Sequence, residues 1–290
     1  MEYTTSDLLS SVKIKAMMPL NQDTFTESDI LSLATEELQS YIMPLVMSVR
    51  EEYYLFQEDI DIVSGTSDYR IPSRAIGSRL RDVVLLSSGN STASLPRLTP
   101  EETVGTMVKT PAFSLRSETI ILHPKPTNSS DKLRLSYFIR PSKLVKTTRG
   151  ASIISIDTNN KKVTVNNVPS NIVSSSKVDL IPGKGGCIPL AIDQSISDIS
   201  GTVITLNSIP EDLAVGDDVV LAEESSRISA PIEFRTLLEQ AVVVKVLEAL
   251  GDTEGLRNAL TKLSQQEKHM LTLISPRVEG EPTVIATDIW

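Results

Sequence analysis

TESDILSLATEELQSYIMPLVMSVREEYYL, residues Thr26 to Leu55, predicts one long amphipathic helix around which the rest of the chain is arranged. Thr26 suits an N-cap, and Asp29 stands three residues later, where a capping-box partner is placed. Because Pro44 lacks an N–H and clashes with the preceding turn, we expect a kink between Gln39 and Pro44. The apolar stripe consists of Ile30, Ala34, Leu38, Tyr41, Ile42, Leu45, Val46 and Val49. At about 1.5 Å per residue the helix is roughly 40 Å long, so we expect it to pack against other parts of the chain or against another chain.

The composition is that of a globular protein and limits the available chemistry. Of 290 residues, 40% are hydrophobic, which predicts a sizeable core and roughly two domains of about 150 residues each. A single cysteine, Cys187, excludes an intrachain disulfide and a multi-cysteine metal site, and two histidines are few for acid–base or zinc chemistry. The net charge of −9 argues against a general nucleic-acid-binding surface, because phosphate neutralisation needs clustered Lys and Arg. We therefore expect no enzyme activity, no cofactor and no metal.

Targeting and membrane signals are also weak in this sequence. No apolar run reaches the roughly 18 to 20 residues of a membrane span. The first residues, MEYTTSDLL, are acidic and polar and lack the apolar core of a signal peptide. We expect a protein made in the cytoplasm of the producing cell, without a membrane partner.

The segments around the long helix predict a short helix and two β-hairpins. Residues 4–18 combine a Thr/Ser/Asp cap with apolar residues at helical spacing. After the long helix, alternation predicts strands at Phe56–Val63 and Tyr69–Ile71, paired as a hairpin, and a further strand at Leu80–Leu86. Phe113–Pro126 and Lys132–Arg140 predict a second hairpin. We expect these strands to form a sheet beside the long helix.

Residues 149–225 differ in composition and contain an internal repeat. They are rich in Ser, Asn, Asp, Gly, Val and Ile in short runs, without helical periodicity. VTVNNVPSNI at 163–172 matches ITLNSIPEDL at 204–213, with an offset of 41 residues between Pro169 and Pro210. Two copies of a strand–turn–strand unit, neither of which can bury its face alone, predict a small barrel or sandwich with pseudo-two-fold symmetry.

Helical patterns return at Ala230 and complete the organisation. One helix ends at Gly251, and another runs from Thr253 to the Ser275-Pro276 stop. The predicted fold class is α+β: a helical core with β-hairpins, an inserted small all-β, barrel-like domain built from the repeat, and an extended C-terminal tail. The domain boundaries are 1–148 and 226–274 for the core, 149–225 for the insert and 275–290 for the tail.

The densest basic cluster, in YRIPSRAIGSRLRD at 69–82, is the first candidate partner-binding site. Its members are Arg70, Arg74, Arg79 and Arg81. In one interpretation these arginines are solvated and paired with Asp68 and Asp82. In the other they meet an acidic partner surface or DNA phosphates, since a planar guanidinium suits both. We retain the acidic partner as the functional hypothesis.

The C-terminal tail is the second candidate. Its apolar anchors are Val284, Ile285, Ile289 and Trp290. They suit strand addition or groove insertion on another chain, with the terminal Trp in a pocket. Docking of the tail on its own domain is the alternative.

Catalytic motifs are weak. PGKGGC at 182–187 resembles a phosphate loop, but a Walker A continues with Ser or Thr and a helix, whereas Ile-Pro follows here, so a turn is favoured. Carboxylate pairs such as Glu36/Glu37 are adjacent in sequence and point apart. Neither His123 nor His269 has a Ser or Cys motif beside it, which argues against a nucleophilic triad.

The N-terminal 145 residues resemble the head-to-tail adaptor (connector, or head-completion) proteins of tailed bacteriophages, particularly those of short-tailed phages. The resemblance lies in the order of a short helix, FTESDILSLATEEL, EEYYLF, YRIPSRAIGSRLRDVVLL, RLTPEE and the FSL…IILHPKP…LRLSYFIRPSKLV hairpin. The inserted repeat departs from the smallest members of the family.

The resemblance implies a structural virion protein in the neck or tail, forming a ring of about twelve copies beneath the portal. Its implied partners are further copies of itself, the portal protein, and tail or tail-hub proteins. Genomic DNA would pass through the lumen without sequence-specific binding, and a net-acidic wall would let it slide. The family also implies that a C-terminal extension reaches along the portal.

Two alternatives remain open from the sequence. Another neck or tail-hub ring protein of the same tail is the nearer one. From a different class, the insert suggests a host-surface or glycan-binding module, but it contains no Trp, Tyr or Phe, the residues that sugars usually stack on. A hydrolase requires convergent polar groups that the sequence does not reveal.

Overall fold

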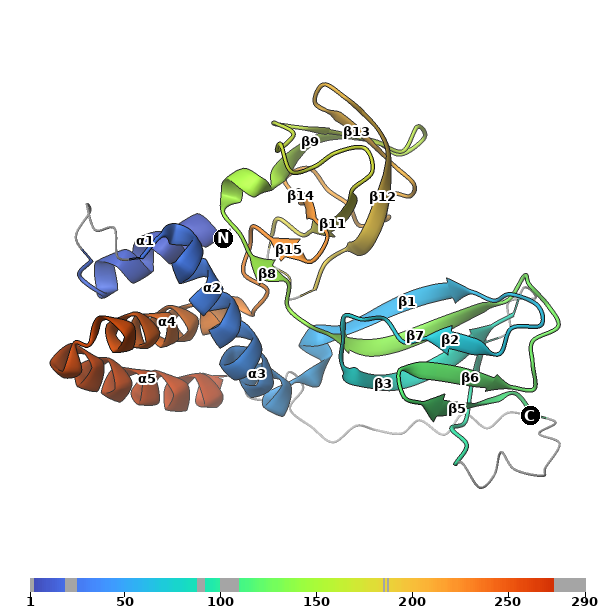
Figure 1. Ribbon diagram of the computed structural model, residues 1–290, viewed down its shortest axis with the longest axis horizontal. Coiled ribbons are helices and arrows are strands. Elements are labelled where there is room, and N and C mark those ends of the chain that lie inside the picture. The colour runs from blue at the N-terminus through green and yellow to red at the C-terminus, as the bar shows by residue number, and fades with distance from the viewer. Residues whose placement is uncertain are drawn as a thin grey trace.

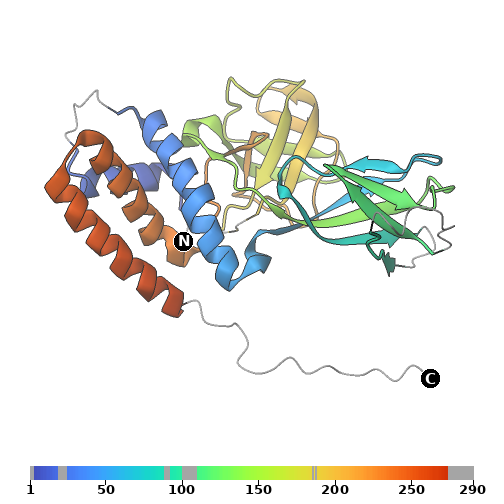
Figure 2. The ribbon, with the colours of Figure 1, turned by 60° about the horizontal axis from the view of Figure 1, so that its bottom comes forward.

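The computed structural model describes residues 3–18, 25–87, 92–99, 110–184, 186 and 188–273. Its fold is mixed α+β, with a helical bundle, two open sheets and a closed six-stranded barrel in separate regions (Figure 1). The bundle lies at one end and the open sheets at the other (Figure 2). Within the described residues, the buried apolar side chains form three clusters, one centred in each region. The predicted α+β class with a barrel is therefore confirmed, while the helices and the open sheets bury separate clusters.

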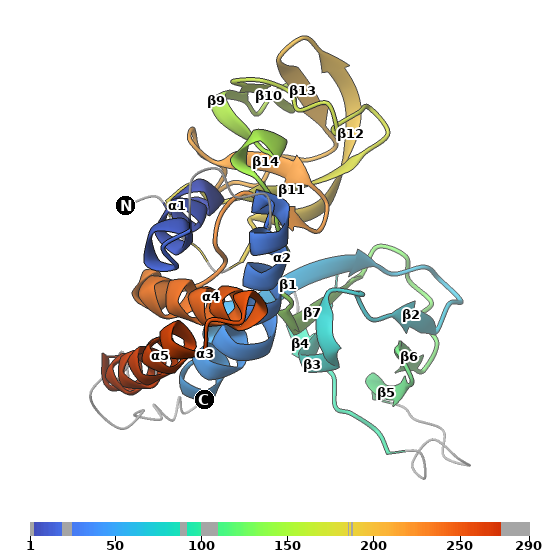
Figure 3. The same cartoon turned by 60° about the vertical axis from the view of Figure 1, so that its left-hand side comes forward.

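The helices are arranged around α4 (Arg235–Leu250), which is apolar nearly all round and largely buried. α1 (Thr5–Lys15) and α5 (Thr253–Leu273) pack on opposite sides of α4, and α2 (Glu27–Glu37) crosses it (Figure 3). The capping box of Thr26 and Asp29 is confirmed, and Thr4 forms another with Asp7. α4 ends at Gly251, whose φ of 74° is in the left-handed region that favours glycine.

The long helix is interrupted as predicted but ends earlier. A π-helical turn, Leu38–Ile42, separates α2 from α3 (Met43–Val49), because Pro44 in the first turn of α3 cannot donate to the preceding turn. The prediction of helix up to Leu55 was wrong: a 3₁₀ turn at 51–54 follows α3, and β1 (Leu55–Asp61) follows the turn. Tyr54 is fully buried there and its hydroxyl donates to the Ser229 carbonyl oxygen at 2.9 Å, so tertiary contacts override the helical pattern.

The two open sheets have the strand orders β1–β7–β3–β4 and β2–β6–β5. The first contains β1, β7 (Lys132–Ile139), β3 (Ala75–Leu86) and β4 (Thr92–Ser94). The second contains β2 (Asp68–Arg70), β6 (Thr119–His123) and β5 (Ala112–Arg116). Their shared cluster includes Leu133, Leu135, Tyr137 and Ile139, which alternate along one face of β7.

Both predicted hairpins were paired wrongly. β1 and β2 follow each other in sequence but belong to different sheets, and β7 pairs with β1 and β3 instead of β6. β7 is a central strand of its sheet. Ser136 and Phe138 on its second face are buried as well, which is typical of a strand with a neighbour along each edge. β6 instead forms a hairpin with β5, through a two-residue turn in which Ser117 has a φ of 55°.

The barrel consists of β9 (Ala151–Asp157), β10 (Lys162–Val165), β11 (Lys177–Ile181), β12 (Ala191–Ser200), β13 (Val203–Leu206) and β14 (Asp218–Leu221). Around it the order is β10–β13–β12–β11–β14–β9. Short strands β8 (Lys143–Leu144) and β15 (Glu224–Ser225) pair in parallel, so the chain enters and leaves the barrel side by side.

Strand pairing inside the barrel joins the two segments of the sequence repeat. Val163 of β10 faces Ile204 of β13, and Asp179 of β11 faces Val220 of β14, which are both pairs at the repeat offset of 41. On either side of Asp179, Val178 faces Leu221 and Leu180 faces Val219. Two backbone hydrogen bonds show the same exchange. Val165 N donates to Thr202 O and Leu206 N donates to Lys161 O, both at 2.9 Å. At the repeat offset Val165 is equivalent to Leu206 and Lys161 to Thr202. The two halves therefore contact each other reciprocally.

Candidate functional site

The structure separates the four predicted arginines. Arg79 and Arg81 lie exposed on β3, where Arg79 stands 5.4 Å above the Phe138 ring and Arg81 forms an ion pair with Glu51 at 2.5 Å. Arg70 is exposed on β2, in the other sheet, with Glu118 3.5 Å away. These three arginines remain available to an acidic partner at a surface.

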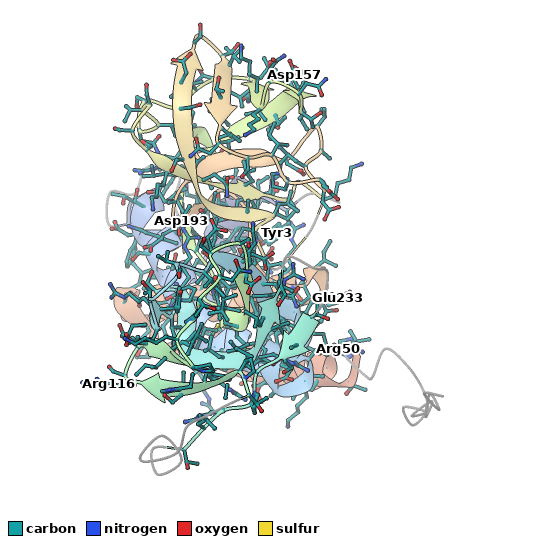
Figure 4. The ribbon with its side chains drawn as sticks, turned by 90° about the vertical axis from the view of Figure 1, so that its right-hand side faces the viewer. Tyr3, Arg50, Arg116, Asp157, Asp193 and Glu233 are labelled. Carbon is teal, nitrogen blue, oxygen red and sulfur yellow. The ribbon has the colours of Figure 1, made fainter. Side chains whose placement is uncertain are left out.

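Arg74 has a different position, because it is only 6% exposed. Its guanidinium donates to both carboxylate oxygens of Asp179 on β11, at 2.6 and 3.1 Å, and to Asp193 on β12 at 3.3 Å. Asp193 lies where the barrel meets the rest of the molecule (Figure 4). Arg74 therefore joins the start of β3 to the base of the barrel, and its role is an internal one.

Asp179 is the centre of this junction and is completely buried. Besides Arg74, it accepts from the backbone N–H groups of Asp193 and Glu223, each at 3.0 Å. Burial raises the pKa of the Asp179 carboxyl above its ordinary value, although the hydrogen bonds and charge of Arg74 act in the opposite direction. The charge of Asp179 is tolerated because these donors surround it.

Two apolar edges of the helical bundle are exposed. α5 is the outermost helix: of its 21 residues only Ala259 and Met270 are buried, while Leu260, Leu271 and Leu273 are exposed. At the opposite side of α4, Ile14 near the end of α1 is 77% exposed and Met17 just beyond it is 90% exposed. We call these the α5 edge (Leu260 and Leu271, which are eleven residues apart and therefore on one face of α5) and the α1 edge (Ile14 and Met17). Two different apolar edges on opposite sides of one bundle are suited to a head-to-tail contact between copies.

Glu239 fixes α1 on α4 between these two edges. Its side chain is almost fully buried and accepts from Tyr3 at 2.8 Å, Ser11 at 2.6 Å, Lys15 at 2.5 Å and Arg235 at 3.0 Å. Burial alone would raise the pKa of the Glu239 carboxyl, but these four hydrogen bonds outweigh it and lower the pKa from 4.5 to about 2. The position of the α1 edge therefore depends on an ionised carboxylate.

Acid should weaken this attachment in a defined pH window. Because the pKa of Glu239 is lower in the folded state than in the unfolded chain, its contribution is complete above about pH 4.5 and is lost as the pH falls towards 2. The pKa difference corresponds to about 3 kcal/mol. We expect Glu239→Gln to be less stable than the wild type at pH 7 and to show a flatter loss of stability between pH 4.5 and 2, measured by urea unfolding followed by circular dichroism. Glu211→Gln, at an exposed barrel loop, is the control, and equal acid sensitivity of both variants would contradict the assignment.

One polar pair was missed by the sequence argument. Ser114 Oγ on β5 and His123 Nε2 on β6 are 2.9 Å apart, beside an open hollow of about 680 Å³ that Arg97 and Arg116 also line. The pairing of Ala112 with His123 places Ser114 and His123 on one sheet face, and the alternation of the two strands was the only sequence signal for it. In the described part of the chain no carboxylate is hydrogen-bonded to His123, so the orienting member of a triad is not present there.

Among the described residues, no group of three or more His, Cys, Asp or Glu side chains is arranged to hold a metal ion. The same residues include no helix with the length and apolar content that a bilayer crossing needs. No family model and no curated protein matches this chain. The function is therefore inferred from the geometry of the chain.

The predicted tail anchors Val284, Ile285, Ile289 and Trp290 lie outside the described residues, which end at Leu273 of α5. Their role remains a prediction.

Proposed function

We propose that this protein is a structural, non-enzymatic virion protein that forms a homo-oligomeric ring joining the portal to the tail of a bacteriophage and continuing its DNA channel. The observation that carries the proposal is the pair of unlike apolar edges on opposite sides of the helical bundle. A contact between the α5 edge of one copy and the α1 edge of the next uses two different surfaces. Repetition of such a contact closes into a ring when the rotation between copies allows it.

The resemblance in the N-terminal half supports the same proposal. Its order of a short helix, the FTESDILSLATEEL helix and the strands from EEYYLF onwards corresponds here to α1, α2 and the strands from β1 onwards. A ring of about twelve copies, with portal and tail proteins on its two faces, is the arrangement we propose from it. Arg70, Arg79 and Arg81, exposed on the open sheets, are the proposed contacts to an acidic partner.

We further propose that the barrel is a duplicated unit inserted between the two parts of a helical core. The reciprocal pairing of the two repeat segments, centred on Val163 with Ile204 and on Asp179 with Val220, supports the duplication. The parallel β8–β15 pair supports an insertion, because both connections to the barrel run together. The role of the barrel differs between the candidate functions. In the alternative function, the barrel would be the host-surface module.

A substitution experiment tests the ring. We expect Leu260→Asp with Leu271→Asp, and separately Ile14→Asp with Met17→Asp, to abolish higher oligomers, because each places charges in an apolar contact. Light scattering after size-exclusion chromatography and negative-stain images would measure assembly, both alone and with the cognate portal protein. Ile154→Asp is the control, because Ile154 is an exposed apolar residue on the barrel.

Mixing the two double variants distinguishes the type of contact. Each variant retains one intact edge, so a head-to-tail contact predicts a dimer of the two and nothing larger. An interface that uses the same edge on both copies predicts no such mixed dimer. If the wild type stays monomeric both alone and with portal, the ring proposal is wrong.

A further inference from the structure

A small polar pocket lies where the three regions of the fold meet. Its cavity measures about 170 Å³. Gln39 comes from the π-helical turn of the bundle, Ser73 and Arg74 from the segment before β3, and Glu223 from the end of the barrel. Of the remaining lining residues, Arg140, Pro141 and Ser142 form the connection from β7 to β8, and Lys143 is the first residue of β8. One cavity is thus lined by all three regions.

The wall of this pocket is fixed by hydrogen bonds between its own members. Arg140 N donates to Arg74 O and Lys143 N donates to Glu223 O, both at 2.9 Å. Gln39 Nε2 donates to Pro141 O at 2.8 Å. The lining is therefore preorganised, and a ligand would not have to order it.

The lining provides more positive than negative groups. Arg140 and Lys143 are exposed, and neither forms an ion pair with another described residue. Arg74 is neutralised by Asp179, but its Nε is buried and is one of the few side-chain donors without a partner in the described structure. Ser73 and Ser142 add hydroxyl groups, and Glu223 is the one carboxylate among the lining residues.

We propose that this pocket binds a small free oxyanion of the phosphate or sulfate class. Two unpaired cations, hydroxyl donors and an unsatisfied guanidinium N–H suit a compact anion with several acceptor oxygens. A water occupies about 30 Å³ of liquid, so the cavity has room for a tetrahedral oxyanion with a few waters. Because its walls come from three regions, the bound anion stabilises their relative arrangement.

Thermal unfolding in phosphate tests the proposal. At constant ionic strength, replacing chloride by inorganic phosphate is expected to raise the melting temperature of the wild type with a saturating dependence on concentration. The double variant Arg140→Ala with Lys143→Ala should lose this shift. It should also lose the heat of phosphate binding measured by isothermal titration calorimetry. The matched control, Arg116→Ala with Lys125→Ala, removes the same charges from the open sheets and should keep both.

Glu223→Gln provides a result that a purely structural role would not give. It removes the one competing carboxylate from the lining, so phosphate should bind several-fold more tightly than to the wild type. An equal thermal shift in all variants would indicate a general salt effect and overturn the proposal. Displacement of phosphate by a DNA oligonucleotide would assign the pocket to a phosphodiester backbone and would also overturn it.

Discussion

Arg74→Ala is expected to destabilise the folded protein by about 3–5 kcal/mol, the usual cost of removing one partner of a buried ion pair. The substitution leaves the completely buried Asp179 carboxylate without its two guanidinium hydrogen bonds, at 2.6 and 3.1 Å. The backbone N–H groups of Asp193 and Glu223 are then the hydrogen-bond donors that still contact the Asp179 carboxylate. Urea unfolding followed by circular dichroism measures the loss.

The pH dependence and a second variant separate this explanation from lost packing. The pKa of Asp179 is already raised by burial, and loss of Arg74 should raise it further. A carboxyl whose pKa is higher in the folded state contributes stability at low pH that is lost as the pH rises, so the destabilisation by Arg74→Ala should shrink as the pH falls towards the ordinary carboxyl pKa of 3.8. Arg74→Ala combined with Asp179→Ala should be more stable than Arg74→Ala alone. If the pH has no influence and the double variant is worse, the buried charge is not the cause.

Gly183→Ala is expected to destabilise the barrel and its attachment by about 3 kcal/mol or more, as substitutions that create a buried clash do. An added Cβ would overlap the carbonyl oxygen of Gly216, which is backbone and cannot rotate away. The Gly183 backbone also cannot retreat freely, since its N–H donates to Asp217 at 2.7 Å and its carbonyl accepts from Arg227 at 2.8 Å. Thermal unfolding followed by circular dichroism would report the loss.

Gly255→Ala is the matched control for this substitution. Its added Cβ would meet the carboxylate of Asp252, a side chain that can rotate at the cost of its hydrogen bond from the Gly255 N–H, which is 2.9 Å long. Since Gly255 is in the first turn of α5, alanine also favours the helix, and the net change should stay within about 1 kcal/mol. Equal losses in the two variants would show that the close approach of the Gly183 and Gly216 loops is not what stabilises the fold.

Local features of the fold were predictable because neighbouring residues decide them. The capping box of Thr26 and Asp29 forms between residues three apart, and the break before Pro44 follows from its missing N–H. Gly251 ends α4 because glycine adopts positive φ without strain. The β-rich character of residues 149–225 was predictable from their composition, and the structure gives a closed barrel there.

Pairing between distant segments was not predictable in the same way. β7 was predicted to pair with the strand that precedes it in sequence. In the structure it lies between β1 and β3, which pair with its two edges, and both of its faces are buried. The four arginines of residues 69–82 looked alike in sequence, and the fold exposed three of them while it buried Arg74 against Asp179, 105 residues away. Ser114 and His123 likewise met only through strand register.

The sequence by itself therefore determined where helices cap, break and end, the α+β class and the β-rich character of residues 149–225, since these depend on bonds and sterics within a few residues. Only the tertiary structure decided which strands pair, which arginine is internal, and which apolar edges and polar pocket remain at the surface. Those outcomes depend on desolvation and on contacts between segments far apart in the chain, whose free energies exist only once the segments have come together.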